Sequence, residues 1–195
     1  MGAQFYRCQR HEAMPAGWLS HGREKTMRCF IGIPVCDTLA DECVRLAEPH
    51  PGAVPKENLH MTLAFLGDCQ QTQVDDLMFA LPRIAETFTT FSVALTRCEP
   101  FPRDRGPYFA LSGALTEPLQ SLHGRVAKLL MDQEMMLESR PFRPHITLAK
   151  PGGPVTRVSG AWTLPVNTLQ LYQSQRGADG RPIYHSLGQF PFSCP

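Results

Sequence analysis

Apolar residues alternate with other residues in two short segments, about 57–66 and 143–149, and this alternation predicts two half-buried β-strands. Successive side chains of a strand point to opposite faces, so one face of each strand is expected to be buried. These apolar faces consist of Leu59, Met61, Leu63 and Phe65 in the first strand, and of Ile146 and Leu148 in the second.

The opposite faces of the two strands carry the same pair of side chains. His60-Met61-Thr62-Leu63 has a near copy in His145-Ile146-Thr147-Leu148, 85 residues later. His and Thr are two residues apart in each copy, so they share a face. Asn58 and Ala64 are expected on the face of the first pair, and Arg143 on that of the second. One His-x-Thr is often accidental, but two copies in the same phase favour a functional site over ordinary packing.

Helical periodicity and turn residues divide the rest of the chain into further elements. Additional strands are expected at 28–33, 91–96, 108–112, 163–172 and 183–188. Helices are expected at about 36–47, 72–88 and 116–137, with Asp37, Thr72 and Thr116 as N-cap candidates. Pro82 conflicts with an uninterrupted second helix and predicts a kink or break there.

Each motif strand follows a helix, which indicates an internal duplication. We therefore predict an α+β fold, a two-lobed pseudo-symmetric duplication in which antiparallel sheets line a central cleft and helices lie on the outside. Residues 27–195 are expected to form this single two-lobed domain. Residues 1–26 show no hydrophobic period and no secretory apolar segment, so they are interpreted as a non-catalytic N-terminal extension.

The composition, with 195 residues of which 43% are hydrophobic and 19% charged, is typical of one globular domain. No apolar run reaches the roughly 18 residues of a membrane-spanning helix. The net charge is only +1, but from Ser139 onward six basic residues accompany one acidic residue, which favours an anionic ligand near the second motif. The seven cysteines include no C-x-x-C pair and no zinc-ligand spacing. Their odd number and the lack of a secretory signal predict reduced thiols and a cytoplasmic location. A monomer is expected.

The paired motifs suit acid–base chemistry on a phosphodiester. Histidine has an ordinary pKa of about 6.5, so two histidines can supply one general base and one general acid near neutral pH. Thr62, Thr147 and Arg143 could donate hydrogen bonds to phosphate oxygens. No carboxylate cluster accompanies the histidines, so neither a metal nor another cofactor is expected. The remaining histidines are interpreted as structural or surface residues: His11, His21, His50, His123 and His185.

These motifs resemble those of the two-histidine (2H) phosphoesterase superfamily, and in particular the RNA 2′,3′-cyclic phosphodiesterases, also called 2′-5′ RNA ligases. The resemblance extends from Met27 to about Phe190. It includes an opening strand, the two motifs and two closing strands, at 28–34, 58–67, 140–149, 171–174 and 184–187.

The resemblance implies an enzyme that hydrolyses the 2′,3′-cyclic phosphate of an RNA 3′ end to a 2′-phosphomonoester, with reversible 2′-5′ ligation in some relatives. It makes His60 and His145 the catalytic pair and Thr62 and Thr147 phosphate ligands. We provisionally assign His60 as the acid and His145 as the base. The role of Arg143 as a phosphate ligand is our own inference.

Two other functions stay open from the sequence: a related 2H enzyme acting on 2′-5′ oligoadenylates or ADP-ribose cyclic phosphate, and a catalytically silent RNA-end-binding module. The expected partners are RNA 3′ ends or small cyclic-phosphate nucleotides, with no membrane. A terminal nucleotide could stack on an aromatic side chain. Phe65, Phe101 and Phe142 are available, but each is expected in the core.

Overall fold

The computed structural model describes residues 26–135 and 140–193. The described residues form two four-stranded antiparallel sheets, three α-helices and a short 3-10 helix, Lys56–Asn58. Of the predicted extension at 1–26, all but Thr26 lies outside the described residues. The third helix ends at Asp132 rather than at residue 137, and residues 136–137 themselves lie outside the described residues. Among the described helices, none is both long and apolar enough to cross a membrane.

Both motif strands lie at an edge of their sheet. The first sheet has the order β2-β1-β7-β8, and the second has the order β5-β4-β3-β6. Strands β2 and β5 carry the motifs and also contact each other, so the two sheets meet at their motif edges. The bounds are β1 Met27–Pro34, β2 His60–Cys69, β3 Phe91–Phe101, β4 Tyr108–Gly113, β5 His145–Ala149, β6 Val158–Val166, β7 Thr168–Arg176 and β8 Pro182–Pro191.

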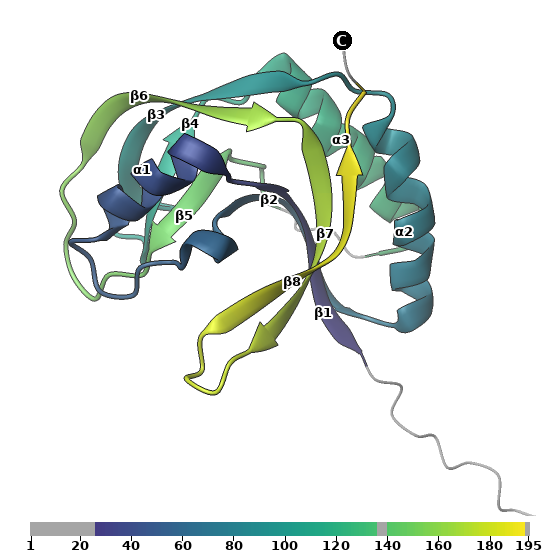
Figure 1. Cartoon of the computed structure of the whole chain (residues 1–195), viewed down its shortest axis with the longest axis horizontal. Helices are drawn as coiled ribbons and strands as arrows, with labels where there is room; N and C mark the ends of the chain where they lie inside the picture. Colours follow the sequence, from purple (N-terminus) through teal and green to yellow (C-terminus); the bar gives the residue numbers. More distant parts are fainter. Residues whose placement is uncertain (1–25, 136–139, 194–195) are drawn as a thin grey trace, which may run out of the picture.

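The unit strand–helix–motif strand occurs twice, as β1-α1-β2 and as β4-α3-β5. Helix α1 (Asp37–Ala47) contacts β5 and β6, and α3 (Glu117–Asp132) contacts β2, so each of these helices packs on the sheet of the other unit. Helix α2 (Gln71–Ala85) covers β7 and β8. Figure 1 shows α1 beside the second sheet, with α2 and α3 beside the first. This arrangement confirms the predicted α+β duplication.

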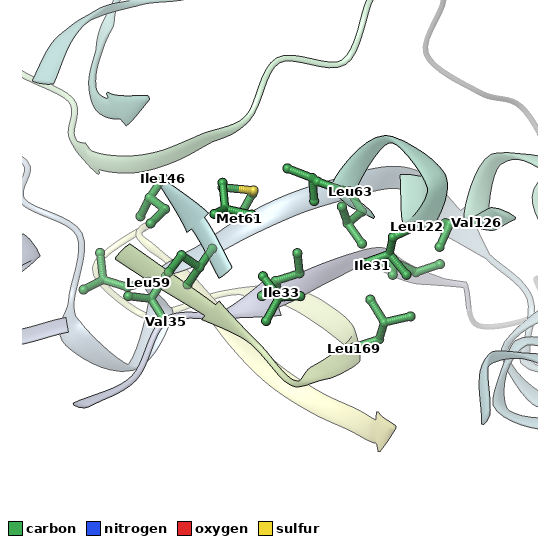
Figure 2. Close-up of a cluster of buried hydrophobic side chains, with 14 of the residues drawn as sticks. Ile31, Ile33, Val35, Leu59, Met61, Leu63, Leu122, Val126, Ile146 and Leu169 are labelled. Carbon is green, nitrogen blue, oxygen red and sulfur yellow. The ribbon is translucent and has the colours of Figure 1, made fainter. Parts of the chain in front are cut away.

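One apolar cluster joins both sheets and the helices. In Figure 2, Ile146 of β5 lies beside Met61 of β2, and Leu122 of α3 lies near Ile31 and Leu63 of the first sheet. The core faces of the two motif strands are thus buried together, and burial of such side chains stabilises a fold by about 1.5–3 kcal/mol each. The histidine faces of the same strands point away from this cluster.

The N-cap residues of the first two helices differ from those expected from the sequence. Asp37 is already the first residue of α1, and the preceding Cys36 has the extended backbone of an N-cap without a capping side-chain bond. Helix α2 is capped by Gln70, whose side chain accepts from the backbone of Gln73 while the Gln73 side chain accepts from the Gln70 N–H. Thr72 therefore lies within the helix, because the reciprocal glutamine pair fixes an earlier start.

Two further predictions concern the N-cap of the third helix and the proline inside the second. Thr116 is the N-cap of α3, as predicted, but its buried hydroxyl finds no hydrogen-bond partner within the described residues. Pro82 lies inside α2, which ends three residues later at Ala85 rather than at residue 88. The helix thus runs through Pro82, and the prediction of a break at this residue is wrong.

The predicted strand at 163–172 is wrong as a single element. It is two strands, β6 and β7, that belong to different sheets and are separated at Asn167, whose carbonyl accepts a hydrogen bond from Phe192. Apolar residues lie on both sides of this junction, Leu164 and Val166 before it and Leu169 and Leu171 after it, so the strand was predicted to continue across Asn167 and Thr168. Strand β3 also extends to Phe101 rather than ending at residue 96, so the loop expected from residue 98 starts later.

A β-bulge changes the face of one aromatic residue. Thr62 and Ala64 pair with consecutive residues of β1, so the intervening Leu63 is an extra residue in the ladder. Leu63 and Ala64 therefore both pack towards the core, and the alternation is reversed beyond them. Phe65 turns to the face of His60 and is 50% exposed. The predictions that Phe65 is buried and that Ala64 shares the histidine face are both wrong.

Candidate active site

The two predicted His-x-Thr pairs come together where the sheets meet. His60 is the first residue of β2 and His145 is the first residue of β5. Both histidines and both threonines are half-buried, so they are held by the strands and still accessible. Because β2 and β5 belong to different sheets, the two pairs approach the same space from different sides.

Each imidazole ring is held by a hydrogen bond of the same kind, between Nδ1 and the backbone carbonyl of the residue two positions earlier. Nδ1 of His60 lies 2.7 Å from the carbonyl oxygen of Asn58, and Nδ1 of His145 lies 2.8 Å from that of Arg143. A carbonyl oxygen only accepts, so Nδ1 is the protonated nitrogen in each ring. Each neutral ring therefore presents Nε2 as its proton acceptor. This shared tautomer is what a pair of acid–base histidines requires.

Thr62 contacts the reactive nitrogen of its own motif. Its hydroxyl oxygen lies 3.0 Å from Nε2 of His60. Because Nε2 of the neutral ring is an acceptor, the hydroxyl donates this bond. Thr147 occupies the corresponding place two residues after His145 and is likewise half-buried.

The pKa of His60 is lowered to about 4. The largest cause is burial, which disfavours the charged ring, and the nearby charge of His145 lowers the pKa further. The hydrogen bond to the Asn58 carbonyl acts in the opposite direction but is outweighed. His60 is consequently neutral at physiological pH, and its unprotonated Nε2 faces the Thr62 hydroxyl.

Aromatic rings surround His60 on its sheet. The Phe30 ring lies 4.6 Å from the imidazole centroid, and Tyr184 meets the imidazole edge-on at 5.1 Å with an interplanar angle of 88°. Tyr172 stacks on Phe30 at 4.8 Å, and its ring lies 5.9 Å from the imidazole. These rings desolvate His60 and fix its plane. They lie far from the motif in the sequence, and only the pairing of β1, β7 and β8 brings them there.

An aromatic ring also stacks on His145. Phe101 stacks on the imidazole with centroids 3.8 Å apart and planes 18° apart. As expected, Phe101 is buried, but its ring also forms part of the site. Phe142, the third aromatic candidate, instead stacks on His123 of α3 at 4.3 Å and packs against the core. His123 thus has the structural role that the sequence indicated.

Arg143 contacts the loop that follows β3. Its Nη1 donates to the carbonyl of Pro102, and its guanidinium carbon lies 4.9 Å from the centroid of the Phe101 ring. Arg143 thereby holds the ring on which His145 stacks. A guanidinium has five N–H donors, so these contacts are compatible with a further bond to a phosphate oxygen.

Asn58 is a site residue whose importance the sequence did not reveal. Its buried amide Nδ2 donates to the carbonyl of Pro182 at 2.8 Å, and its Oδ1 accepts from the Tyr184 N–H at 3.4 Å. These bonds attach the start of β8 to the residue that orients His60, close to the end of the β7–β8 hairpin that projects from the molecule in Figure 1. One signal was available: Asn58 precedes its histidine by two residues, as Arg143 precedes His145.

Gly32 leaves space beside the first motif. It pairs with Thr62 across the ladder, and a Cβ atom there would lie 3.0 Å from the Met61 carbonyl oxygen and 3.5 Å from Cδ2 of His60. A larger residue would crowd the imidazole. The absence of a side chain at Gly32 therefore leaves the surface beside Thr62 open.

The site differs in character from a metal centre. Within residues 26–135 and 140–193, no three His, Cys, Asp or Glu side chains form a group that could hold a metal ion. The polar side chains that β2, β5 and the residue two before β5 bring to this junction carry two imidazoles, two hydroxyls and one guanidinium. Together they can move protons and donate hydrogen bonds to an anion.

Comparisons with known proteins lead to the same chemistry. A sequence profile of the 2′-5′ RNA ligase superfamily matches residues 35–177. The RNA 2′,3′-cyclic phosphodiesterase of Thermus thermophilus is 30% identical over 148 residues, which cover 70% of this chain and 73% of the relative. That of Bacillus subtilis is 28% identical over 127 residues, which cover 62% and 69%.

A solved structure shares the fold as well. The crystal structure of E. coli LigT complexed with NADP+ has 25% sequence identity and a TM-score of 0.70, and the match covers 86% of this chain and 99% of LigT. The resemblance inferred from the two motifs is thus confirmed, and the chain belongs to the 2′-5′ RNA ligase superfamily.

Proposed function

We propose that this protein is an enzyme that hydrolyses the 2′,3′-cyclic phosphate of an RNA 3′ end to a 2′-phosphomonoester. The observation that carries the proposal is the matched pair of imidazoles on β2 and β5, each with Nδ1–H bonded to a backbone carbonyl, which leaves Nε2 as the proton acceptor of the neutral ring. The names of the Thermus and Bacillus relatives support the same reaction.

The reaction needs proton transfer on both sides of phosphorus. Water attacks phosphorus as the bond to the 3′ oxygen breaks, so the water loses a proton and the 3′ oxygen gains one. We assign the base to His60, because burial lowers its pKa to about 4 and its Nε2 is unprotonated at neutral pH. His145 then serves as the acid for the 3′ oxygen. This reverses the provisional assignment made from the sequence.

Thr62, Thr147 and Arg143 are proposed to hold the non-bridging phosphate oxygens. Hydrogen-bond donors placed where negative charge develops lower the barrier, and one such donor typically contributes 10²- to 10³-fold in rate. In the free protein the Thr62 hydroxyl donates to Nε2 of His60. A bound phosphate would take over this bond and leave Nε2 available to the attacking water.

The same steps, with an RNA 5′ hydroxyl in place of water, would join two RNAs through a 2′-5′ bond, and reversal of this joining would cleave the bond and restore the cyclic phosphate. Free RNA ends and small cyclic-phosphate nucleotides are accordingly the proposed partners. The cytoplasmic location and the monomeric state stay predictions from the sequence.

One experiment separates the functions considered. The protein is incubated with EDTA and one of three substrates: an RNA with a 2′,3′-cyclic phosphate, a 2′-5′ adenylate trimer, or ADP-ribose 1″,2″-cyclic phosphate. We expect conversion of the RNA to a 2′-phosphate without added metal. Turnover of only another substrate would assign the site to that substrate, and binding of the RNA without turnover would identify a silent module.

A further inference from the structure

The polar face of the second sheet continues from His145 to the far edge of the sheet. His145 of β5 pairs with Ser112 of β4, which pairs with Arg97 of β3. Arg97 in turn pairs with Ser159 of β6. Side chains of directly paired residues lie on the same face of an antiparallel sheet. These four side chains therefore form one row that leads from the active site to β6.

A hollow of about 230 Å³ lies at the β6 end of this row. Its lining comes from β3 and from the start of β6, and it includes Arg97, Glu99, Arg157 and Ser159. Adjacent strands of a sheet are about 4.8 Å apart, so β3 lies roughly 10 Å from β5, the strand of His145. The hollow is thus a neighbour of the active site, separated from it by the width of β4.

The carboxylate in the hollow is held by other residues of the sheet. Oε1 of Glu99 accepts a hydrogen bond from the Ser112 hydroxyl at 2.8 Å. Nε of Arg97 lies 3.8 Å from the same oxygen, which is longer than a hydrogen bond. The Glu99 side chain is only 14% exposed, whereas that of Arg97 is 61% exposed. The acid is therefore largely covered, and the guanidinium reaches the surface, where its donors can bond an anion.

The second arginine of the hollow is held by an exposed partner. Nη2 of Arg157 donates to Oδ1 of Asp104 at 2.6 Å, and both side chains are mostly exposed. An ion pair in this environment contributes little to stability, because water screens it. A phosphate can therefore replace the carboxylate of Asp104 at small cost, and Arg157 is available to a ligand in the hollow.

The charge around the hollow is positive. Residues 97–107 contain three arginines and two acids, namely Arg97, Arg103, Arg105, Glu99 and Asp104. Arg143 and Arg157 contact the same segment, through the Pro102 carbonyl and the Asp104 carboxylate. Five guanidinium groups therefore accompany two carboxylates, which gives this part of the surface a net charge of +3. Such a surface attracts an anionic ligand.

We propose that this hollow is a subsite for the phosphodiester group that joins the terminal nucleotide of the RNA to the nucleotide before it. The proposal rests on the function proposed above and deepens it, because it makes the substrate an oligonucleotide end rather than a single nucleotide. With the cyclic phosphate at the two histidines, the sugar–phosphate backbone extends along the row, and its next phosphate meets Arg97 and Arg157. Guanidinium groups bond phosphate oxygens without reading the bases, so any sequence is accepted.

The test compares the steady-state kinetics of three substrates. They are adenosine 2′,3′-cyclic phosphate, the dinucleotide ApA with a 2′,3′-cyclic phosphate end, and the same dinucleotide with an uncharged methylphosphonate link. The wild type should have a KM roughly 10-fold lower for the charged dinucleotide than for the other two, a typical effect of a hydrogen bond to a charged group. Raising the salt concentration should reduce this preference.

Two variants each remove one guanidinium and keep a polar side chain, Arg97→Gln and Arg157→Gln. Each should raise KM for the charged dinucleotide roughly 3- to 10-fold and leave the kinetics with the other two substrates unchanged. Arg97→Lys should retain part of the preference, since it keeps the positive charge. Arg83→Gln is the matched control, because Arg83 lies on α2 against Phe79, and it should equal the wild type with all three substrates.

Equal losses with all three substrates would show that the arginines support the structure of the site, and would overturn the proposal. A loss that persists with the methylphosphonate would assign the hollow to a base or a sugar and would also overturn it. So would a wild type that does not distinguish the charged link from the uncharged one.

If the wild type turns over none of the substrates, the proposed function fails separately. The subsite is then tested by calorimetric binding of ApA 2′-phosphate and of its methylphosphonate analogue. Tighter binding of the charged form by the wild type, lost in Arg97→Gln, supports the subsite. Equal binding of the two forms by the wild type, or a preference that Arg97→Gln retains in full, overturns it.

Discussion

The imidazole of His145 stacks on Phe101 with centroids 3.8 Å apart and an interplanar angle of 18°. Phe101 is itself contacted by Arg143, which also donates to the Pro102 carbonyl. The orientation of one proposed catalytic group thus depends on a residue 44 positions away in the chain. His60, by contrast, is surrounded by rings of its own sheet.

Replacing Phe101 by leucine should lower kcat by about 10-fold and leave KM nearly unchanged, because the imidazole loses the ring that fixes its plane while the phosphate ligands remain. Phe142→Leu is the matched control, since Phe142 also stacks on a histidine, His123, at 4.3 Å but away from the motifs. Steady-state kinetics with an RNA cyclic phosphate measure the difference. Equal effects of the two substitutions would show that only packing is involved.

Removal of the Thr62 hydroxyl should reduce kcat/KM by roughly 10²- to 10³-fold, the usual cost of losing a donor to a developing negative charge. Thr62→Val removes the hydroxyl and nearly keeps the shape, and Thr62→Ser keeps the hydroxyl. The serine variant should retain most of the activity. A valine variant that is as active as the serine variant would exclude Thr62 from phosphate binding.

Asn58→Ala should lower the free energy of unfolding by about 1–3 kcal/mol, because it leaves the Pro182 carbonyl and the Tyr184 N–H without the amide that now bonds them. Urea unfolding measures this loss. Gln71→Ala removes an exposed side-chain bond to Asp75 and serves as the control. It should change stability by less than about 0.5 kcal/mol. Equal destabilisation by both substitutions would show that the Asn58 side chain does not stabilise the attachment of β8.

The pH dependence of kcat/KM should reflect the lowered pKa of His60. A base must be unprotonated, so activity is lost as pH falls through its pKa. Burial holds that pKa at about 4, and the acidic limb should therefore lie well below the ordinary value of 6.5. An acidic limb near 6.5 that disappears in a His60 variant would contradict the assignment of His60 as a buried base.

The same shift affects stability with a defined sign. Unfolded His60 binds a proton at the ordinary pKa of 6.5, whereas folded His60 binds it only near 4. The unfolded state therefore gains protons first, and the free energy of unfolding falls as pH decreases from about 6.5 to about 4, by up to about 3 kcal/mol. His60→Gln should lose this part of the pH dependence in urea unfolding, and an unchanged dependence would contradict the shift.

The sequence predicted those features that depend on local pattern. Alternation placed His60 and Thr62 on one face and Met61 in the core, and the repeated motif indicated two lobes. It could not predict the bulge at Leu63, because a bulge exists only in the pairing of β2 with β1. Phe65 was consequently assigned to the wrong face.

The aromatic environment of the histidines could not be predicted from the sequence either. Phe101 reaches His145, and Tyr184 reaches His60, through contacts between strands that are distant in the chain. The break between β6 and β7 at Asn167 has the same origin, since it is set by the sheet to which each strand belongs. Pattern defines the elements, whereas the register and partners of the strands determine which side chains meet.

The central claim is that His60 and His145 act as a proton-transferring pair on a cyclic phosphate. The most direct measurement is the rate at which an RNA with a 2′,3′-cyclic phosphate is converted to a 2′-phosphate, in EDTA, by the wild type, His60→Ala and His145→Ala. We expect turnover by the wild type and losses of roughly 10²- to 10⁴-fold in each variant, with both variants folded by circular dichroism. Near wild-type turnover by either variant, or abolition of wild-type activity by EDTA, would contradict the account.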